Sequence, residues 1–205
     1  MPPADGRAIA WSVRLDSEAA AAALSRAAHT DRDLADFAAA PDAGKRLLRR
    51  RLTRALVARL TGVAPDAILF GRTPEGAPSL LSPKGWHVSV AGKAPLCLIG
   101  LAPEPIGVDV EAEDGAPPAW DMLAPSEGSA LAFLSADLQS REWLRRWSAK
   151  EAHAKRLGFA RRAEPTAIRT RAVDYDLLAC SSREGESACY TRLLGGRIEA
   201  VALGA

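Results

Sequence analysis

The tightest local constraint on the fold is a hexapeptide in the middle of the chain, Ile106–Glu111, which reads Ile-Gly-Val-Asp-Val-Glu. Because successive side chains of a strand point to opposite faces, this alternation predicts a strand with one apolar, buried face. Asp109 and Glu111 then lie together on the other face, about 7 Å apart along the strand. Two carboxylates this close repel each other unless a cation offsets their charge or water surrounds them. Mg²⁺ suits them because it is a hard ion that prefers oxygen ligands; the alternative is a solvated edge face.

A second group of charged residues lies on a helical pattern further along the chain. Trp147, Glu151 and Lys155 are spaced four residues apart, so they share one face of the helix. The alternative is an ordinary surface Glu–Lys pair, whereas His153 lies off this face and is expected at the surface. Taken with the strand, three carboxylates could surround one metal ion, while Lys150 and Lys155 neutralise phosphates bound to it. Such a set is typical of phosphoryl-group chemistry, in which cations stabilise developing charge.

The remainder of the chain alternates helical patterns with short apolar runs, which predicts an α+β fold. Helices are expected at Ala19–Leu24, Asp31–Ala40, Lys45–Leu60, Pro125–Leu134 and Ser140–Leu157. Strands are expected at Ala8–Leu15, Trp86–Val90, Leu96–Leu101 and Ile106–Glu111, and as short segments within Ala172–Leu203. Two prolines between Ala102 and Pro105 mark a junction. We place the boundary there, giving an N-terminal half, residues 1–103, and a C-terminal half, residues 104–205.

The helical pattern Lys45–Leu60 combines an apolar stripe with a strong positive charge. Leucines recur every fourth residue from Leu48 to Leu60, which predicts one buried face. The segment Lys45–Arg59 holds seven basic residues and no acidic one. Such a run is either a solvated helix face or a site for phosphates or an acidic partner.

Composition excludes several other classes of protein. The hydrophobic fraction of 48% and charged fraction of 25% are ordinary for a globular chain, and the net charge of +2 offers no basis for nucleic-acid binding. Three cysteines without a C-x-x-C spacing favour a reducing compartment. No signal-peptide pattern and no apolar run of about 20 residues is present, so we expect a cytoplasmic protein without membrane association.

The strand and helix motifs together resemble those of the 4'-phosphopantetheinyl transferase superfamily, in particular its larger, Sfp-type members. The family pattern is a (V/I)-G-(V/I)-D-x-E strand followed by W-(S/T/C)-x-K-E-(A/S)-x-x-K, and every fixed position is present in Ile106–Glu111 and Trp147–Lys155. Weaker similarity extends to Ala8–Leu15, which is similar to the first strand of the family. Gly76-Ala77-Pro78 and His87–Val90 fall where the family has G-K-P and N-x-S-H.

The resemblance implies two similar α+β halves with coenzyme A in the cleft between them, in a monomer. The implied reaction moves 4'-phosphopantetheine from coenzyme A to a serine of an apo acyl or peptidyl carrier protein and releases 3',5'-ADP. The implied Mg²⁺ ligands are Asp109, Glu111 and Glu151. The implied contacts to coenzyme A are Arg46, His87, Ser89, Lys150 and Lys155. Glu151, directly or through water, would deprotonate the serine, with Asp109 and Lys155 completing the catalytic set.

Two departures from the family pattern lie on the nucleotide side of the implied site. Ala77 replaces the lysine of G-K-P and Val90 replaces the histidine of S-H, which predicts weak affinity for coenzyme A. Substitutes could come from other basic residues, namely Arg72, Lys84, His87 and Lys93. The departures also motivate an alternative, a non-catalytic relative that binds carrier protein or coenzyme A without transfer.

Two further expectations concern partners and competing chemistry. For carrier docking, the sequence suggests Arg141, Arg145 and Arg161. A magnesium-dependent nuclease is a second alternative, but Glu113 stands where the usual restriction-type site has a lysine.

Overall fold

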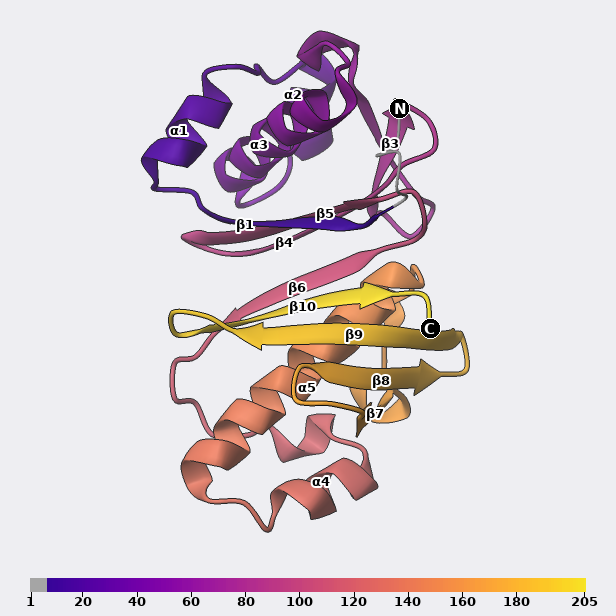
Figure 1. The fold of residues 1–205 in the computed structure, drawn as a ribbon. Helices are drawn as coiled ribbons and strands as arrows, with labels where there is room; N and C mark the ends of the chain where they lie inside the picture. Colours follow the sequence, from indigo (N-terminus) through magenta and orange to yellow (C-terminus); the bar gives the residue numbers. More distant parts are fainter. Residues whose placement is uncertain (1–6) are drawn as a thin grey trace.

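The computed structural model describes residues 7–205 and folds them into a mixture of helices and antiparallel sheets (Figure 1). One sheet has the strand order β1-β5-β4, a second has the order β6-β10-β9-β8-β7, and β2 and β3 form a short hairpin sheet. All of these strand pairs are antiparallel. The expected mixed class of fold is therefore confirmed. Among the helices of the described residues, none is both long and apolar enough to cross a membrane.

Three helices cover one face of the three-stranded sheet, which forms the upper part of Figure 1. The strands are β1 (Ile9–Arg14), β4 (His87–Lys93) and β5 (Leu96–Ala102); the helices are α1 (Glu18–Leu24), α2 (Asp31–Phe37) and α3 (Ala43–Thr61). Leu52 of α3 packs on Cys97 and Ile99 of β5. The hairpin strands β2 (Leu69–Arg72) and β3 (Pro78–Ser82), which the sequence did not predict, extend this core through Phe70.

The basic run on α3 is neither a purely solvated face nor a purely ligand-binding one. Arg50 and Arg54 are buried and form ion pairs with the buried Asp33 of α2. Arg51 donates hydrogen bonds to the backbone carbonyls of Leu24 and Ala27. These arginines therefore hold α1 and α2 against α3, and the remaining basic residues are left for other roles.

In the C-terminal part, helix α5 lies across the five-stranded sheet (Figure 1). The strands are β6 (Gly107–Ala112), β7 (Arg169–Ala172), β8 (Leu177–Ser182), β9 (Gly185–Leu193) and β10 (Arg197–Leu203); the helices are α4 (Pro125–Leu131) and α5 (Ala136–Arg156). Helix α5 begins at Ala136 rather than at Ser140, with Ser135 at its N-cap position. The interface between α5 and the sheet is built largely from small residues: Ala149, Ala152, Leu178, Cys180, Cys189, Ala200 and Ala202. Small side chains let the helix backbone approach the strands closely.

Strand β6 also contacts the three-stranded sheet. The backbone N–H of Val108 donates a 3.0 Å hydrogen bond to the Oγ of Ser89 on β4. Gly100 of β5 faces Val108, and a Cβ at Gly100 would lie 2.6 Å from the Cγ1 of Val108. On the neighbouring strand β10, the buried Glu199 accepts a hydrogen bond from Ser12 of β1. Strand β6, the edge strand of the five-stranded sheet, thus packs against the three-stranded sheet.

Candidate active site

A close approach of backbone to backbone positions the two motifs against each other. At Gly107 on β6, a Cβ atom would lie 1.9 Å from the carbonyl oxygen of Ala152 on α5. Only glycine permits this contact, so the glycine of the hexapeptide brings the strand onto the motif helix. As a result, the Nζ of Lys155 lies 2.6 Å from the Oδ1 of Asp109 and 3.8 Å from the Oε2 of Glu151.

The three predicted carboxylates interact with one another electrostatically. Burial raises the pKa of Asp109, the charge of Lys155 counteracts this in part, and the charge of Glu111 raises the pKa further. Burial likewise raises the pKa of Glu151, and the negative charges of Asp109 and Glu111 add to the increase. The positive charge of Lys155 lowers this pKa in part. Glu111 is held by an ion pair with Lys93, whose Nζ lies 2.7 Å from its Oε2.

The site can be tested for its fit to a metal ion. Within residues 7–205, no three side chains of His, Cys, Asp or Glu are already arranged as the ligands of one ion. The ammonium groups of Lys155 and Lys93 balance the carboxylates instead. However, the buried Oδ2 of Asp109 makes no hydrogen bond, although the Ser148 hydroxyl is near enough to lower the pKa of the carboxyl. Carboxylate oxygens with one oxygen unpartnered suit a hard cation such as Mg²⁺, so the residues fit the implied ion.

A cavity of about 480 Å³ opens beside Lys155. It is lined from β4 by His87, Ser89 and Val90, from the β2–β3 turn by Ala77, and from α5 by Lys155. The structure therefore brings three predicted ligand-binding residues, His87, Ser89 and Lys155, to one cavity. His87 is exposed, whereas Ser89 is buried and also accepts the hydrogen bond from Val108.

A second cavity, of about 300 Å³, shares residues with the first. Among residues 7–205, its lining contains five arginines and no acidic residue: Arg46, Arg49, Arg50, Arg72 and Arg161. The predicted residue Arg46 lies here, paired with Asp42 at 2.5 Å. Both cavities are lined by Gly76, Pro78, Val88, Val90 and Arg161. A ligand with several negative charges could extend from Lys155 into the arginine-lined cavity.

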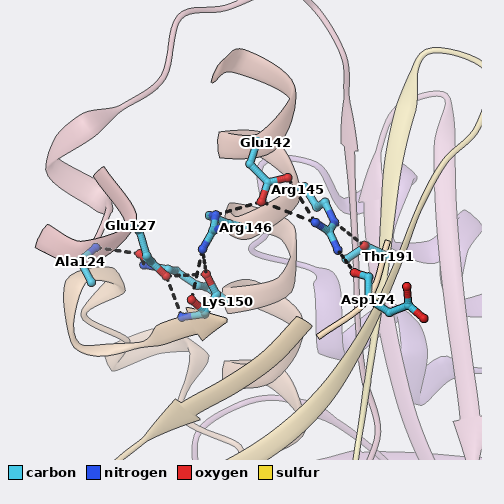
Figure 2. A network of polar contacts seen from close by, with 9 residues as sticks. Ala124, Glu127, Glu142, Arg145, Arg146, Lys150, Asp174 and Thr191 are labelled. Carbon is cyan, nitrogen blue, oxygen red and sulfur yellow. Dashed lines mark hydrogen bonds and ion pairs between the residues drawn. The ribbon is translucent and has the colours of Figure 1, made fainter. Parts of the chain in front are cut away.

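Lys150 requires a correction, because the structure does not bring it to either cavity. Its side chain is only 2% exposed, and its Nζ donates hydrogen bonds to the Oε2 of Glu127 at 2.6 Å and to the carbonyls of Pro165 and Met122 at 2.8 and 3.2 Å. All three N–H donors are used, so none is left for a phosphate. Figure 2 shows Lys150 reaching toward Glu127, which also accepts from the Ala124 N–H. Lys150 stabilises the packing of α4 on α5.

His153 also differs from the expectation, since it is fully buried rather than at the surface. Its Nδ1 lies 2.8 Å from the Oγ of Ser187 and its Nε2 lies 3.0 Å from the Oγ of Ser182, on the sheet below α5. Burial lowers the pKa of His153 to about 4, so the ring is neutral near pH 7. His153 is part of the core and not of the candidate site.

The residues suggested as substitutes for the lysine of G-K-P and the histidine of S-H lie in different places. His87 lines the first cavity and Arg72 the second, whereas Lys84 lines neither and Lys93 is paired with Glu111. Arg161, which the sequence suggested for carrier docking, lines both cavities. No pattern in the sequence placed Arg161 at a ligand cavity, because it lies in a short 3-10 helix after α5 and reaches the cavities through the path of that loop.

No protein-family model matches the chain, and no curated protein matches it significantly.

Proposed function

We propose that this protein is a Mg²⁺-dependent 4'-phosphopantetheinyl transferase that uses coenzyme A to modify a serine of an acyl or peptidyl carrier protein. One observation carries the proposal. Asp109 and Lys155 come from motifs far apart in the sequence, yet they form an ion pair beside a cavity that Ser89 and His87 also line. A lysine paired with a buried carboxylate, next to a cation-rich cavity, suits the binding and cleavage of a diphosphate.

The roles of the residues follow from their charges. Mg²⁺, held by Asp109, Glu111 and Glu151, would polarise the phosphoryl oxygens of the diphosphate. Lys155 neutralises the charge that develops on the leaving 3',5'-ADP. Its ammonium is already held at the edge of the cavity by Asp109, so it needs only to turn toward the phosphate.

Glu151 is suited to accept a proton from the carrier serine, directly or through water. Its carboxylate lies 3.8 Å from the Nζ of Lys155, which lines the first cavity, so it lies close to the proposed reacting groups. The serine Oγ then forms a bond to the β-phosphorus of coenzyme A, and the bond between that phosphorus and the oxygen bridging to 3',5'-ADP breaks. The β-phosphate stays with the modified serine, and the other two phosphates stay with the released 3',5'-ADP. The serine proton passes to Glu151 or to water.

We also propose that the chain is built from two α+β halves, residues 1–103 and 104–205, and that it acts as a monomer. In support, the first cavity is lined by His87 and Ser89 from one side of this boundary and by Lys155 from the other. A single copy of the chain therefore supplies every residue of the proposed site.

The carrier protein would dock in an apolar groove of about 580 Å³ beside α5. The groove is lined by exposed apolar residues, among them Leu138, Tyr175 and Leu193. Among the described residues of its lining, four arginines (Arg141, Arg145, Arg146 and Arg192) outnumber two acidic residues (Glu142 and Asp174). The side chains of Arg141 and Arg192 are 48% and 59% exposed, whereas Arg146 is buried. An acidic partner with exposed apolar side chains complements such a surface. Arg141 and Arg145 thus remain candidates for docking, whereas Arg161 lies at the ligand cavities.

A second candidate function is a non-catalytic relative that binds coenzyme A or carrier protein without transfer. The observation that favours it is the presence of Ala77 and Val90 in the lining of the first cavity, where neither contributes a charge.

The experiment that separates the two is the intact mass of several apo carrier proteins after incubation with the protein, coenzyme A and Mg²⁺. A mass gain of one phosphopantetheine arm, absent with Asp109→Ala, supports the transferase. Binding of coenzyme A without any mass gain supports the non-catalytic relative. If the protein binds neither coenzyme A nor a carrier protein, and no carrier gains mass, both proposals are wrong.

A further inference from the structure

Arg161 reaches across from the loop that follows α5 to the β2–β3 turn. Its guanidinium lies flat against Gly76, where an added Cβ would be 2.8 Å from the Cζ of Arg161 and 2.9 Å from both terminal nitrogens. Gly76 also has a φ of 82°, a conformation that favours glycine. The turn is therefore shaped so that an arginine from a distant part of the sequence can lie directly on its backbone.

The charge of Arg161 is not used elsewhere in the described part of the chain. Within residues 7–205, its guanidinium makes no hydrogen bond and no ion pair. The other arginines of the second cavity are all engaged. Arg46 and Arg49 pair with Asp42, Arg50 pairs with Asp33 and Asp36, and Arg72 donates to the carbonyls of Gly76 and Asp36. Arg161 can thus bind an anion without breaking an existing contact.

Its location is equally specific, because Arg161 lies at the junction of the two cavities. Ala77 follows Gly76 directly and lines the first cavity, so the guanidinium is close to the position where the charge expected from the resemblance is missing. A guanidinium presents a planar fork of N–H donors that matches the oxygens of a phosphate.

We propose that Arg161 binds a phosphate of the ligand at the junction of the cavities and supplies the cation that Ala77 does not. This inference rests on the proposed function for the identity of the full ligand. The ligand class is a nucleotide that carries phosphate groups at more than one position, extending from Lys155 into the arginine-lined cavity. Binding would then join the loop after α5 to the β2–β3 turn through one phosphate.

The test compares ligand affinity by isothermal titration calorimetry for the wild type, Arg161→Ala and Arg161→Lys, with coenzyme A as the probe. Arg162→Ala is the matched control, since Arg162 lies on the same turn, is 59% exposed and lines neither cavity. We expect Arg161→Ala to weaken binding about tenfold or more, because a charge-assisted hydrogen bond is lost. The affinity of Arg161→Lys should lie between the affinities of the wild type and of Arg161→Ala. Arg162→Ala should leave the affinity unchanged.

A second probe, inorganic pyrophosphate, keeps this inference separate from the proposed function. If the wild type binds pyrophosphate but not coenzyme A, and Arg161→Ala weakens pyrophosphate binding, then Arg161 is an anion site although the proposed substrate is wrong. If the wild type binds coenzyme A or pyrophosphate, and Arg161→Ala binds that ligand with equal affinity, the inference is overturned. Failure of the wild type to bind both probes would overturn it as well.

Discussion

The ammonium group of Lys155 lies 2.6 Å from the Oδ1 of Asp109, which joins the end of helix α5 to the middle of strand β6. The contact depends on Gly107, because a side chain there would push the helix away from the strand. The other carboxylate oxygen of Asp109 is buried and makes no hydrogen bond within the described part of the chain. A buried polar atom left without a partner is costly in a purely structural residue, so this arrangement favours a role in binding or catalysis.

The first prediction separates function from stability at Asp109. Asp109→Asn keeps the shape of the side chain and an acceptor for Lys155, and its amide nitrogen can still meet the nearby Ser148 hydroxyl. We expect the free energy of unfolding to change by less than about 1 kcal/mol. Transfer to a carrier protein should fall about a hundredfold or more, because the amide loses the negative charge. Urea unfolding and the initial rate of carrier modification measure the two effects.

The matched control for this substitution is Asp66→Asn, since Asp66 is exposed and lines neither cavity. It should change neither quantity. A large loss of stability in Asp109→Asn with normal activity per folded molecule would make Asp109 a structural residue and contradict the prediction.

The second prediction concerns Lys150, which the structure makes a stabilising residue. Lys150→Met leaves the carboxylate of Glu127 buried without its ammonium partner. We expect a loss of about 3 kcal/mol in the free energy of unfolding. The double variant Glu127→Gln/Lys150→Met should recover part of this loss, because no charge then remains buried.

Coenzyme A affinity of the folded fraction should be unchanged in Lys150→Met, whereas Lys155→Met should weaken it. Calorimetric titration at a temperature where both variants are folded makes the comparison. If Lys150→Met were as stable as the wild type but bound coenzyme A poorly, the assignment of Lys150 to the core would be wrong.

Much of the scaffold around the site follows from sequence patterns that act locally. The alternation in Ile106–Glu111 predicted a strand, and the structure has β6 at Gly107–Ala112. The spacing of Glu151 and Lys155 predicted a shared helix face, and their side chains form an ion pair. The hairpin strands Leu69–Arg72 and Pro78–Ser82 were missed, because they are short and their pairing with each other, rather than any strong local pattern, defines them.

The predictions for Lys150 and His153 were wrong because both are polar residues that the fold buries. Lys150 is separated from Lys155 by about 140° around the helix, so its side chain points to the opposite side. This angle follows from the sequence spacing alone. His153 is buried because Ser182 and Ser187, on two different strands, supply partners for both ring nitrogens. Such long-range pairing leaves no local signal. The same holds for Arg161, whose position depends on the path of a loop.

The third prediction concerns the link between the two larger sheets at Glu199. This carboxylate is 2% exposed and accepts hydrogen bonds from Ser12 on β1, Arg192 on β9 and Arg197 on β10. Burial alone would raise the pKa of Glu199, but these donors more than offset it, and the pKa lies below its ordinary value of 4.5. At neutral pH, Glu199→Gln should therefore lower the free energy of unfolding by about 2 kcal/mol.

The pH dependence has a definite sign. Above 4.5 the carboxylate is ionised in both the folded and the unfolded states, and its contribution is fully present. As pH falls below that value, the unfolded state takes up the proton first, and the contribution is lost as the folded carboxyl is protonated in turn. The difference in stability between the wild type and Glu199→Gln should thus shrink below pH 4.5, measured by urea unfolding at several pH values. The exposed Glu164→Gln serves as a control and should show no such trend; a constant difference for Glu199→Gln would refute the assignment.

The fourth prediction tests the apolar groove as the docking surface for an acidic carrier protein. Leu138 on α5 is 49% exposed and lines the groove, so a polar substitution there leaves the core intact. Leu138→Asp and Leu138→Lys remove the same apolar contact but add opposite charges. Against an acidic partner, Leu138→Asp should raise KM for the carrier about tenfold, whereas Leu138→Lys should raise it much less.

KM for coenzyme A should stay the same in both variants, because the groove shares no residue with the two ligand cavities. Equal effects of the two charges would mean that the contact is apolar only, and unchanged carrier kinetics in both variants would exclude docking in this groove.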